Sequence, residues 1–119
     1  MYINPKNNWI IDNMTLPEEL NGVKIPKKKL MAYCKKNHIK KLAFFGSLLR
    51  DDFNPESDID ILIEFEEEYI PGLFDLVRME EELSTLFNGQ KVDLRTPNDL
   101  SRYFRNKVIS NAEIIYARN

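Results

Sequence analysis

The sequence predicts a small α/β (α+β) protein, a mixed sheet of about three to four strands with helices packed on it. Short segments that are either apolar throughout or alternate between apolar and polar residues are separated by segments of helical period, so the sequence predicts strands that alternate with helices. The length of 119 residues suits a single domain with one core. A composition of 43% hydrophobic and 30% charged residues excludes a disordered chain and a membrane-spanning one.

The first regular element that the sequence predicts is a helix. Residues 1–24 lack a clear hydrophobic period, so we expect an N-terminal extension ahead of a domain over residues 25–119. Pro26 suits the first turn of a helix, and apolar residues follow it at helical spacing, with lysines on the remaining surface. These features predict a helix over residues 26–37.

Two strands with different patterns are predicted next. Residues 42–45, Leu-Ala-Phe-Phe, form a continuous apolar run that ends at a glycine, which predicts a buried strand. A short helical turn and a loop follow. In residues 58–65 an isoleucine-rich face alternates with a face that carries Asp58 and Asp60. This segment predicts a strand with one face in the core and one that presents carboxylates.

A long helix and a third strand follow in the prediction. Pro71-Gly72 opens the helix and Asn88-Gly89 closes it. In residues 91–95, Asp93 alternates with apolar neighbours, which predicts a strand with a polar side. The expected buried stripe of the helix consists of Leu73, Leu76, Val77, Leu83, Leu86 and Phe87.

A capped helix and a short strand complete the predicted fold. Thr96 suits an N-cap, Pro97 suits the first helical position, and Asp99 lies three residues after the cap. A final strand is predicted around residues 114–116. The expected buried face of the capped helix consists of Leu100, Tyr103, Phe104 and Val108.

The charge and cysteine content narrow the function classes. A net charge of −2 excludes a generically basic nucleic-acid binder, so no direct nucleic-acid binding is expected. Basic and acidic residues are nevertheless segregated along the chain. Residues 24–50 carry nine bases and no acid, whereas residues 51–82 carry thirteen acids and one base. The single Cys34 excludes an internal disulfide, and no signal peptide is visible. We therefore expect a cytoplasmic protein without membrane attachment.

Three aspartates lie at positions on predicted strands that suit the binding of metal ions in phosphate chemistry. Asp58 and Asp60 are two residues apart on a predicted strand, so both carboxylates project from one face. Two carboxylates at that spacing repel each other unless a cation lies between them, and Mg²⁺ binds one or two carboxylates together with phosphate oxygens. Asp93 adds a third if its strand pairs beside the first, which would make a two-metal platform for phosphoryl or nucleotidyl transfer. A solvated edge strand is the alternative, although aspartate is disfavoured in strands.

Gly46-Ser47 is the second motif that suggests a chemical function. It stands between a buried strand and a helical turn, where glycine lets a polyanion approach and the first helical amides point at it. Ser47 adds a hydroxyl donor, or serves only as an N-cap. The dipeptide alone is a weak motif. It becomes strong when Asp-x-Asp follows after ten residues, as it does here.

The combination of Gly46-Ser47, ten residues and Asp58-Ile59-Asp60 resembles the polymerase-beta-type nucleotidyltransferase superfamily. It is most similar to the minimal nucleotidyltransferases (MNT, MntA-like) that act as antitoxins to HEPN (HepT-like) toxins. The resemblance covers roughly residues 25–117, and Asp93 in KVDLRT stands at the place of the third carboxylate. It implies a minimal nucleotidyltransferase fold.

The resemblance also implies an activity and a role for each site residue. The reaction is transfer of AMP from ATP to a tyrosine hydroxyl of a cognate HEPN RNase toxin, which neutralises the toxin. Asp58 and Asp60 would hold two Mg²⁺ ions, one of them shared with Asp93. Gly46 and Ser47 would hold the β- and γ-phosphates. Arg50 would neutralise charge on the leaving pyrophosphate, a role that needs a fixed cation near the loop.

Two alternatives remain open on the sequence alone. The first is a non-catalytic antitoxin that binds and occludes its partner, with the aspartates as relics. The second is an aminoglycoside-type nucleotidyltransferase with a small-molecule acceptor. Superfamily members with such acceptors usually carry a further domain that binds them, so the short length of 119 residues favours a partner protein as acceptor.

Overall fold

The structure of the protein is a computed structural model that describes residues 18–117. Residues 1–17, most of the predicted N-terminal extension, lie outside the described residues. In chain order the elements are β1 (Glu19–Leu20), β2 (Val23–Lys24), α1 (Lys27–Lys36), β3 (Ile39–Phe45), the short 3₁₀ helix η1 (Gly46–Leu49), β4 (Ile59–Phe65), α2 (Leu73–Leu86), β5 (Val92–Arg95), the 3₁₀ helix η2 (Pro97–Asp99), α3 (Arg105–Asn111) and β6 (Glu113–Ala117).

A four-stranded mixed sheet forms the centre of the molecule, with the strand order β5-β4-β3-β6. β3 pairs antiparallel with β4 and with β6, whereas β4 and β5 are parallel. The parallel pair is joined through α2, as parallel strands require a long connection. The predicted mixed sheet of three to four strands, including the short final strand, is confirmed.

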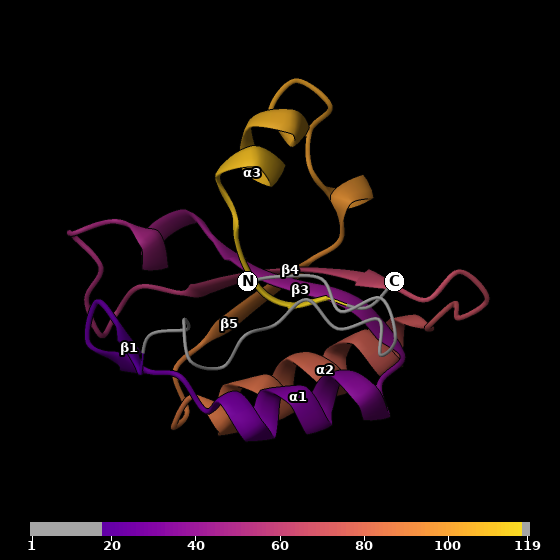
Figure 1. Cartoon of the computed structure of the whole chain (residues 1–119), viewed down its shortest axis with the longest axis horizontal. Helices are drawn as coiled ribbons and strands as arrows, with labels where there is room; N and C mark the ends of the chain where they lie inside the picture. Colours follow the sequence, from indigo (N-terminus) through magenta and orange to yellow (C-terminus); the bar gives the residue numbers. More distant parts are fainter. Residues whose placement is uncertain (1–17, 118–119) are drawn as a thin grey trace.

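The two faces of the sheet are covered differently, as Figure 1 shows. α1 and α2 lie side by side against one face, and the segment with α3 rises from the other face. The helices contact each other through a hydrogen bond from the Tyr33 hydroxyl to the carbonyl oxygen of Met79, at 3.1 Å. An ion pair at 2.7 Å joins Lys36 to Glu82 at their solvent edge. The face opposite α1 and α2 is therefore the one left for polar chemistry.

The hydrophobic core lies between the sheet and these two helices. Ile59, Ile61 and Ile63 of β4 point into it at every second position, as their alternation predicted, and the apolar run of β3 is buried as predicted. Burial of this much apolar surface is the main stabilising contribution to the fold. Its largest fully buried members are Tyr116, Phe44, Leu30, Ile39, Leu42, Leu48, Ile59, Ile61, Ile63, Met79, Leu83 and Val92.

A hairpin precedes α1 that the sequence analysis did not predict. β1 and β2 pair antiparallel around Asn21-Gly22, both with positive φ, which is the backbone conformation of a tight two-residue turn. Val23 and Ile25 are buried in the core. Residues 18–24 thus pack on the domain, and the Asn-Gly pair was the signal for this turn.

The predicted single helix after Thr96 is wrong. The capping contacts form, since the Thr96 backbone N–H and hydroxyl both donate to the Asp99 carboxylate at 3.0 Å. The turn nevertheless ends at Leu100, and only a short separate helix follows, α3. A helix needs an apolar surface to pack against, and the sheet face beneath this segment carries aspartates. As a result, Tyr103 and Phe104, predicted as core, are 83% and 63% exposed.

The buried stripe predicted for α2 is confirmed only in its second half. Leu83 and Phe87 are buried, but Leu73 and Val77 at the start of the helix are 74% and 48% exposed. Leu76 packs against the core from this end, whereas Leu73 and Val77 lie beyond the part of the core that residues 18–117 form. Among the described residues, none of the helices has the length and apolar character needed to span a bilayer.

Candidate active site

Asp60 and Asp93 lie next to each other on the sheet face away from α1 and α2. Strand pairing sets this directly, because Asp60 is the register partner of Asp93 on β5 and of Phe45 on β3. Residues paired across strands point to the same face. Phe45, Asp60 and Asp93 therefore form one row across three strands, here called the carboxylate row. Asp58 precedes β4 by one residue and is half-buried.

The electrostatics of Asp60 show that this row concentrates negative charge. Burial is the main cause that raises the pKa of the Asp60 carboxyl above its usual value, and the nearby carboxylates of Asp93 and Asp58 raise it further. The backbone N–H of Ser47 and the guanidinium of Arg50 act in the opposite direction. A cation bound beside this half-buried carboxylate would offset the repulsion from the two neighbouring negative charges.

The loop at Gly46 is packed directly against the Asp60 carboxylate. Gly46 has φ +66°, and a Cβ atom at this position would overlap the Asp60 Oδ2 atom. The Ser47 backbone N–H donates to that oxygen at 3.4 Å, and the Ser47 hydroxyl donates to the carbonyl oxygen of Asp58 at 2.9 Å. The hydroxyl makes no helix cap, because Phe45 holds the cap position. Gly46, Ser47, Asp58 and Asp60 are therefore brought together as the spacing predicted.

Asp93 and Asp58 each face a basic side chain. Arg95 donates from Nε and Nη2 to the two oxygens of Asp93, both at 3.2 Å. The Nζ atom of Lys91 lies 3.8 Å from Oδ2 of Asp58. Within residues 18–117, no three acidic, histidine or cysteine side chains gather in a way that suits a metal ion. Asp93 shares the row with Asp60, but its carboxylate is turned to Arg95.

The donor set fits a hard divalent cation such as Mg²⁺. Asp58 and Asp60 supply carboxylate oxygens, the ligands that Mg²⁺ prefers, and Mg²⁺ uses only one or two protein carboxylates when phosphate oxygens complete its shell. Burial, and after it the carboxylates of Asp93 and Asp58, raise the pKa of Asp60, so a bound cation would favour its charged form. Asp93 joins this set only when its carboxylate leaves Arg95.

Arg50 follows η1 and stands at the rim of the site. Its side chain is exposed, and its Nε atom lies 3.4 Å from an oxygen of Asp52. Its charge nevertheless reaches Asp60, whose pKa it lowers. The predicted position of Arg50 as a cation near the loop agrees with this geometry.

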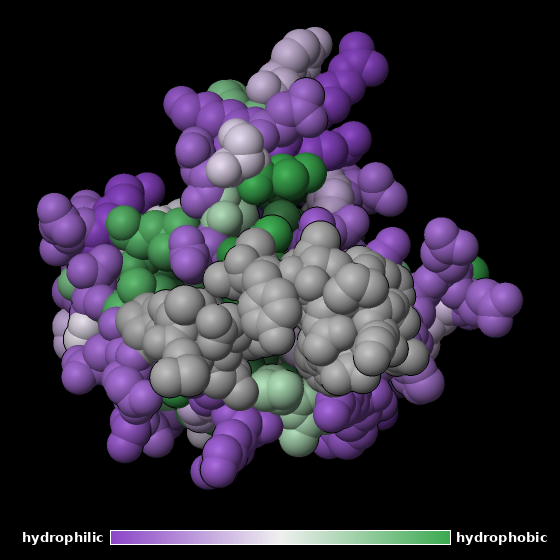
Figure 2. Space-filling model, viewed as in Figure 1, coloured by the Kyte–Doolittle hydropathy of each residue, from purple (hydrophilic) through white to green (hydrophobic). Residues whose placement is uncertain are grey.

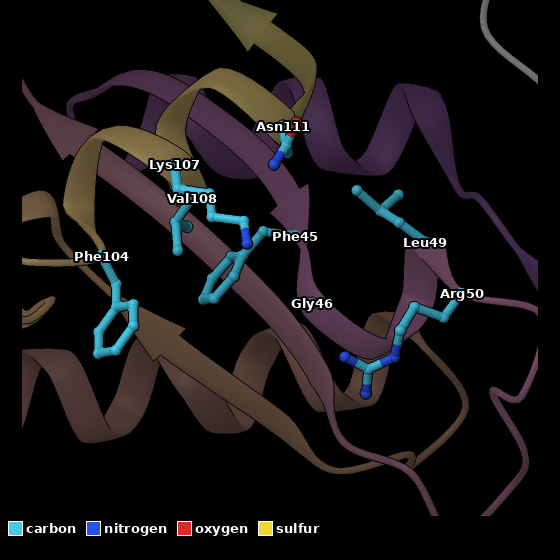
Figure 3. Close-up of a pocket in the computed structure, with 8 residues that line it drawn as sticks. All are labelled: Phe45, Gly46, Leu49, Arg50, Phe104, Lys107, Val108 and Asn111. Carbon is cyan, nitrogen blue, oxygen red and sulfur yellow. The ribbon is translucent and has the colours of Figure 1, made fainter.

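A cavity of about 490 Å³ opens beside the carboxylate row, between η1 and α3. Figure 3 shows Phe45 and Gly46 on one side and the side chains of α3 and Phe104 on the other. Figure 2 shows apolar surface between the α3 segment at the top and the sheet below it. The full lining consists of Phe45, Gly46, Leu49, Arg50, Phe104, Lys107, Val108 and Asn111.

The comparison with known families decides what this arrangement is. A family model described as polymerase beta, nucleotidyltransferase, matches residues 28–119. The chain belongs to this nucleotidyltransferase family. The match covers the loop at Gly46, all three aspartates and the segment with α3. The predicted membership and the predicted nucleotidyltransferase activity are thereby confirmed.

This nucleotidyltransferase is similar to a protein named protein adenylyltransferase, and chains of the same fold occur in solved toxin–antitoxin complexes. Protein adenylyltransferase MntA of Thermococcus cleftensis is 35% identical over 78 residues, which are 66% of this chain and 74% of that protein. A crystallised toxin–antitoxin complex with AMP-PNP contains a chain of the same fold, with a TM-score of 0.64, 16% identity and coverage of 80% of this chain and 76% of that one. The complex of a tri-AMPylated Shewanella oneidensis HEPN toxin with an MNT antitoxin gives a TM-score of 0.55, 17% identity and coverage of 76% and 69%.

Sequence reasoning missed one residue that positions the site of this nucleotidyltransferase. Asn21, in the turn of the unpredicted hairpin, donates from its side-chain amide to the carbonyl oxygens of Leu48 and Arg50, both at 2.7 Å. It thereby holds the C-terminal end of the turn that begins at Gly46. Asn21-Gly22 carried a hairpin signal, but no local pattern connects it with a loop 27 residues further on.

Proposed function

We propose that this nucleotidyltransferase is a protein adenylyltransferase antitoxin, which transfers AMP from ATP to a tyrosine of a cognate HEPN RNase toxin and so neutralises it. The observation that carries the proposal is the contact of the Gly46 loop with Asp60, which suits a turn that binds phosphate beside a carboxylate that binds a cation. Relatives named protein adenylyltransferase and structural neighbours in toxin–antitoxin complexes support the acceptor class. An RNase toxin acts on cellular RNA, so we place the pair in the cytoplasm.

The reaction proposed for the site is a displacement at phosphorus. The tyrosine oxygen attacks the α-phosphorus of ATP, the bond from this phosphorus to the oxygen that bridges to the β-phosphate breaks, and pyrophosphate leaves. The phenolic proton passes to solvent. Two Mg²⁺ ions, when bound, supply the Lewis acid that stabilises charge on the phosphates and lowers the pKa of the attacking hydroxyl.

The residues of the chain bind and orient the reactants in this proposal. Asp58 and Asp60 would hold the metal ions, and Asp93, which is paired with Arg95 in the structure, would join them once released from that contact. The backbone at Gly46 and Ser47 receives the β- and γ-phosphates, because the glycine leaves no side chain in their way. Arg50, at the rim, offsets the charge that develops on the leaving pyrophosphate.

An exposed apolar surface at the start of α2 suits the partner protein. Ile70, Leu73 and Phe74 are 90%, 74% and 88% exposed, and Val77 is half-exposed one turn later. Apolar surface of this kind marks protein interaction sites. The neighbours in solved complexes are bound to HEPN toxins, so we propose that a protomer of the cognate toxin covers this start of α2.

Replacing Phe74 with aspartate is expected to weaken binding of the toxin by about tenfold or more, because a charge would be buried in an apolar contact. Phe74 is too exposed to support the core, so the thermal midpoint should not fall. The measurement is isothermal titration of the toxin into the antitoxin. Thr85→Asp, an exposed position on the last turns of the same helix, is the matched control and should bind as the wild type does. Unchanged affinity of Phe74→Asp would place the interface elsewhere.

Label transfer from ATP tests the proposed chemistry. The protein is incubated with Mg²⁺, the toxin encoded beside it and ATP labelled at either the α- or the γ-phosphate. Adenylyl transfer predicts that the toxin carries label only with α-labelled ATP, since the β- and γ-phosphates leave as pyrophosphate. Label from the γ-position would indicate phosphoryl transfer instead. An unlabelled toxin would contradict the proposal.

A further inference from the structure

We propose that the cavity between η1 and α3 binds the nucleoside part of the nucleotide, with Phe104 as a surface for the base and Lys107 as a ligand of the phosphates. This assignment rests on the proposed function and extends it to the segment after β5, where the sequence analysis placed no site residue. Neither side chain is needed for the core, since Phe104 is 63% exposed and Lys107 is also exposed.

The first support is position. Phe45, which lines the cavity, is the register partner of Asp60, so cavity and carboxylate row share one sheet face and touch each other. Gly46, packed on the Asp60 carboxylate, lines the same cavity. A nucleotide with its phosphates at Gly46 can therefore place its nucleoside in this cavity. The volume of about 490 Å³ lies within the range of small-molecule sites.

The second support is the chemistry of the lining. Phe45 and Phe104 provide aromatic surface, Leu49 and Val108 provide aliphatic surface, and none of the lining residues within 18–117 is acidic. The charged groups among these residues are two cations, Arg50, which follows η1, and Lys107 from α3. A ligand with a flat apolar part and a polyanionic part matches this lining, and a nucleoside triphosphate has both.

The third support is the exposure of Phe104 itself. The turn η2 ends at Leu100, and the Phe104 ring just before α3 lies outside the core, over a sheet face that carries aspartates. Figure 3 shows Phe104 and Lys107 projecting into the cavity from the same side, with Arg50 and Gly46 opposite. Bases stack on exposed aromatic side chains with little dependence on sequence, so a nucleotide gives this ring a contact that the fold does not.

Binding of nucleotide, measured apart from transfer, tests the assignment. The probes are the Mg²⁺ complexes of a non-hydrolysable ATP analogue and of tripolyphosphate, with dissociation constants from calorimetry. Phe104→Ala is expected to weaken the ATP analogue by roughly tenfold and to leave tripolyphosphate unchanged, since only the base contact is lost. Lys107→Met is expected to weaken both ligands, because both carry the phosphates.

Two matched variants control for surface changes in general. Tyr103→Ala removes an aromatic ring that is even more exposed and does not line the cavity. Lys40→Met removes a lysine near the start of β3, at the end of the strand opposite Gly46. Both should bind the ATP analogue as the wild type does.

The outcomes separate this assignment from the proposed function. If Phe104→Ala and Lys107→Met bind the ATP analogue with wild-type affinity while the wild type labels the toxin, the assignment is overturned and the proposed function stands. If both variants lose affinity but the toxin is never labelled, the cavity assignment stands and the acceptor is wrong. A wild type that binds no Mg²⁺–ATP analogue would overturn both.

Discussion

Replacing Asp60 with asparagine will abolish transfer of AMP to the toxin, by about a thousandfold or more, and will leave the fold intact. The amide keeps the shape of the side chain but lacks the charge that binds a hard cation. The rate of toxin labelling with α-labelled ATP measures the effect. Glu56→Gln, which removes an exposed carboxylate from the loop before β4, is the matched control and should transfer at the wild-type rate.

Although it abolishes activity, the same substitution is not expected to lower the stability of the fold. A measurement of stability therefore distinguishes a loss of catalysis from a loss of folding. Burial and the neighbouring carboxylates raise the pKa of Asp60 in the folded protein above its usual 3.8. A raised folded-state pKa means that stability is highest when the group is protonated and is lost as the pH rises through that pKa. At neutral pH without metal, the charged Asp60 therefore destabilises the fold, and asparagine removes this cost.

Thermal unfolding with a chelator present measures this expectation. The midpoint of Asp60→Asn at pH 7 should equal or exceed that of the wild type, and the difference should shrink as the pH is lowered toward 4 and Asp60 becomes protonated. A midpoint several degrees lower at pH 7 would mean that Asp60 holds the fold together, and its loss of activity would then say nothing about metal binding.

Replacing Gly46 with alanine is expected to abolish transfer and to destabilise the fold. The residue has φ +66°, where an L-residue costs about 1–2 kcal/mol. The added methyl group would also overlap the Asp60 Oδ2 atom, so either the loop or the carboxylate must move. Both movements disrupt the contact between the phosphate turn and the carboxylate row.

The variant Gly89→Ala separates the cost of the positive φ from the cost of the overlap with Asp60. Gly89 has φ +85° but nothing within 4 Å of a new Cβ atom, so this variant carries the backbone cost alone. Urea unfolding should show a loss of stability in both variants, whereas toxin labelling should be lost only in Gly46→Ala. Normal labelling by a folded Gly46→Ala would show that the close approach to Asp60 has no role in catalysis.

The parts of the fold that could be predicted are those in which one face is buried. Alternation in residues 58–65 and 91–95 located β4 and β5, and their pairing brings Asp60 beside Asp93. The contacts of Asp60 with Gly46 and Ser47 agree with the spacing of the motif. Hydrophobic period and turn residues are strong signals in such segments, because burial enforces them.

The parts that could not be predicted depend on partners far along the chain. The helical spacing after Thr96 was genuine, but the face beneath it carries aspartates, so the segment leaves Tyr103 and Phe104 exposed. The contact of Arg95 with the Asp93 carboxylate depends on side-chain orientation, which periodicity does not report. The hydrogen bonds from the Asn21 side chain to Leu48 and Arg50 join two segments that are far apart in the sequence and meet only in the folded chain.

The intact mass of the toxin tests the central claim most directly. The toxin is incubated with the antitoxin, Mg²⁺ and ATP, separated under denaturing conditions and weighed by mass spectrometry, with Asp60→Asn in a parallel reaction. We predict a toxin heavier by one or more AMP groups with the wild type, located on tyrosine by peptide mapping, and an unmodified toxin with Asp60→Asn. A tight, inactive complex in which the toxin keeps its original mass would contradict covalent transfer and would show that the antitoxin acts by occlusion.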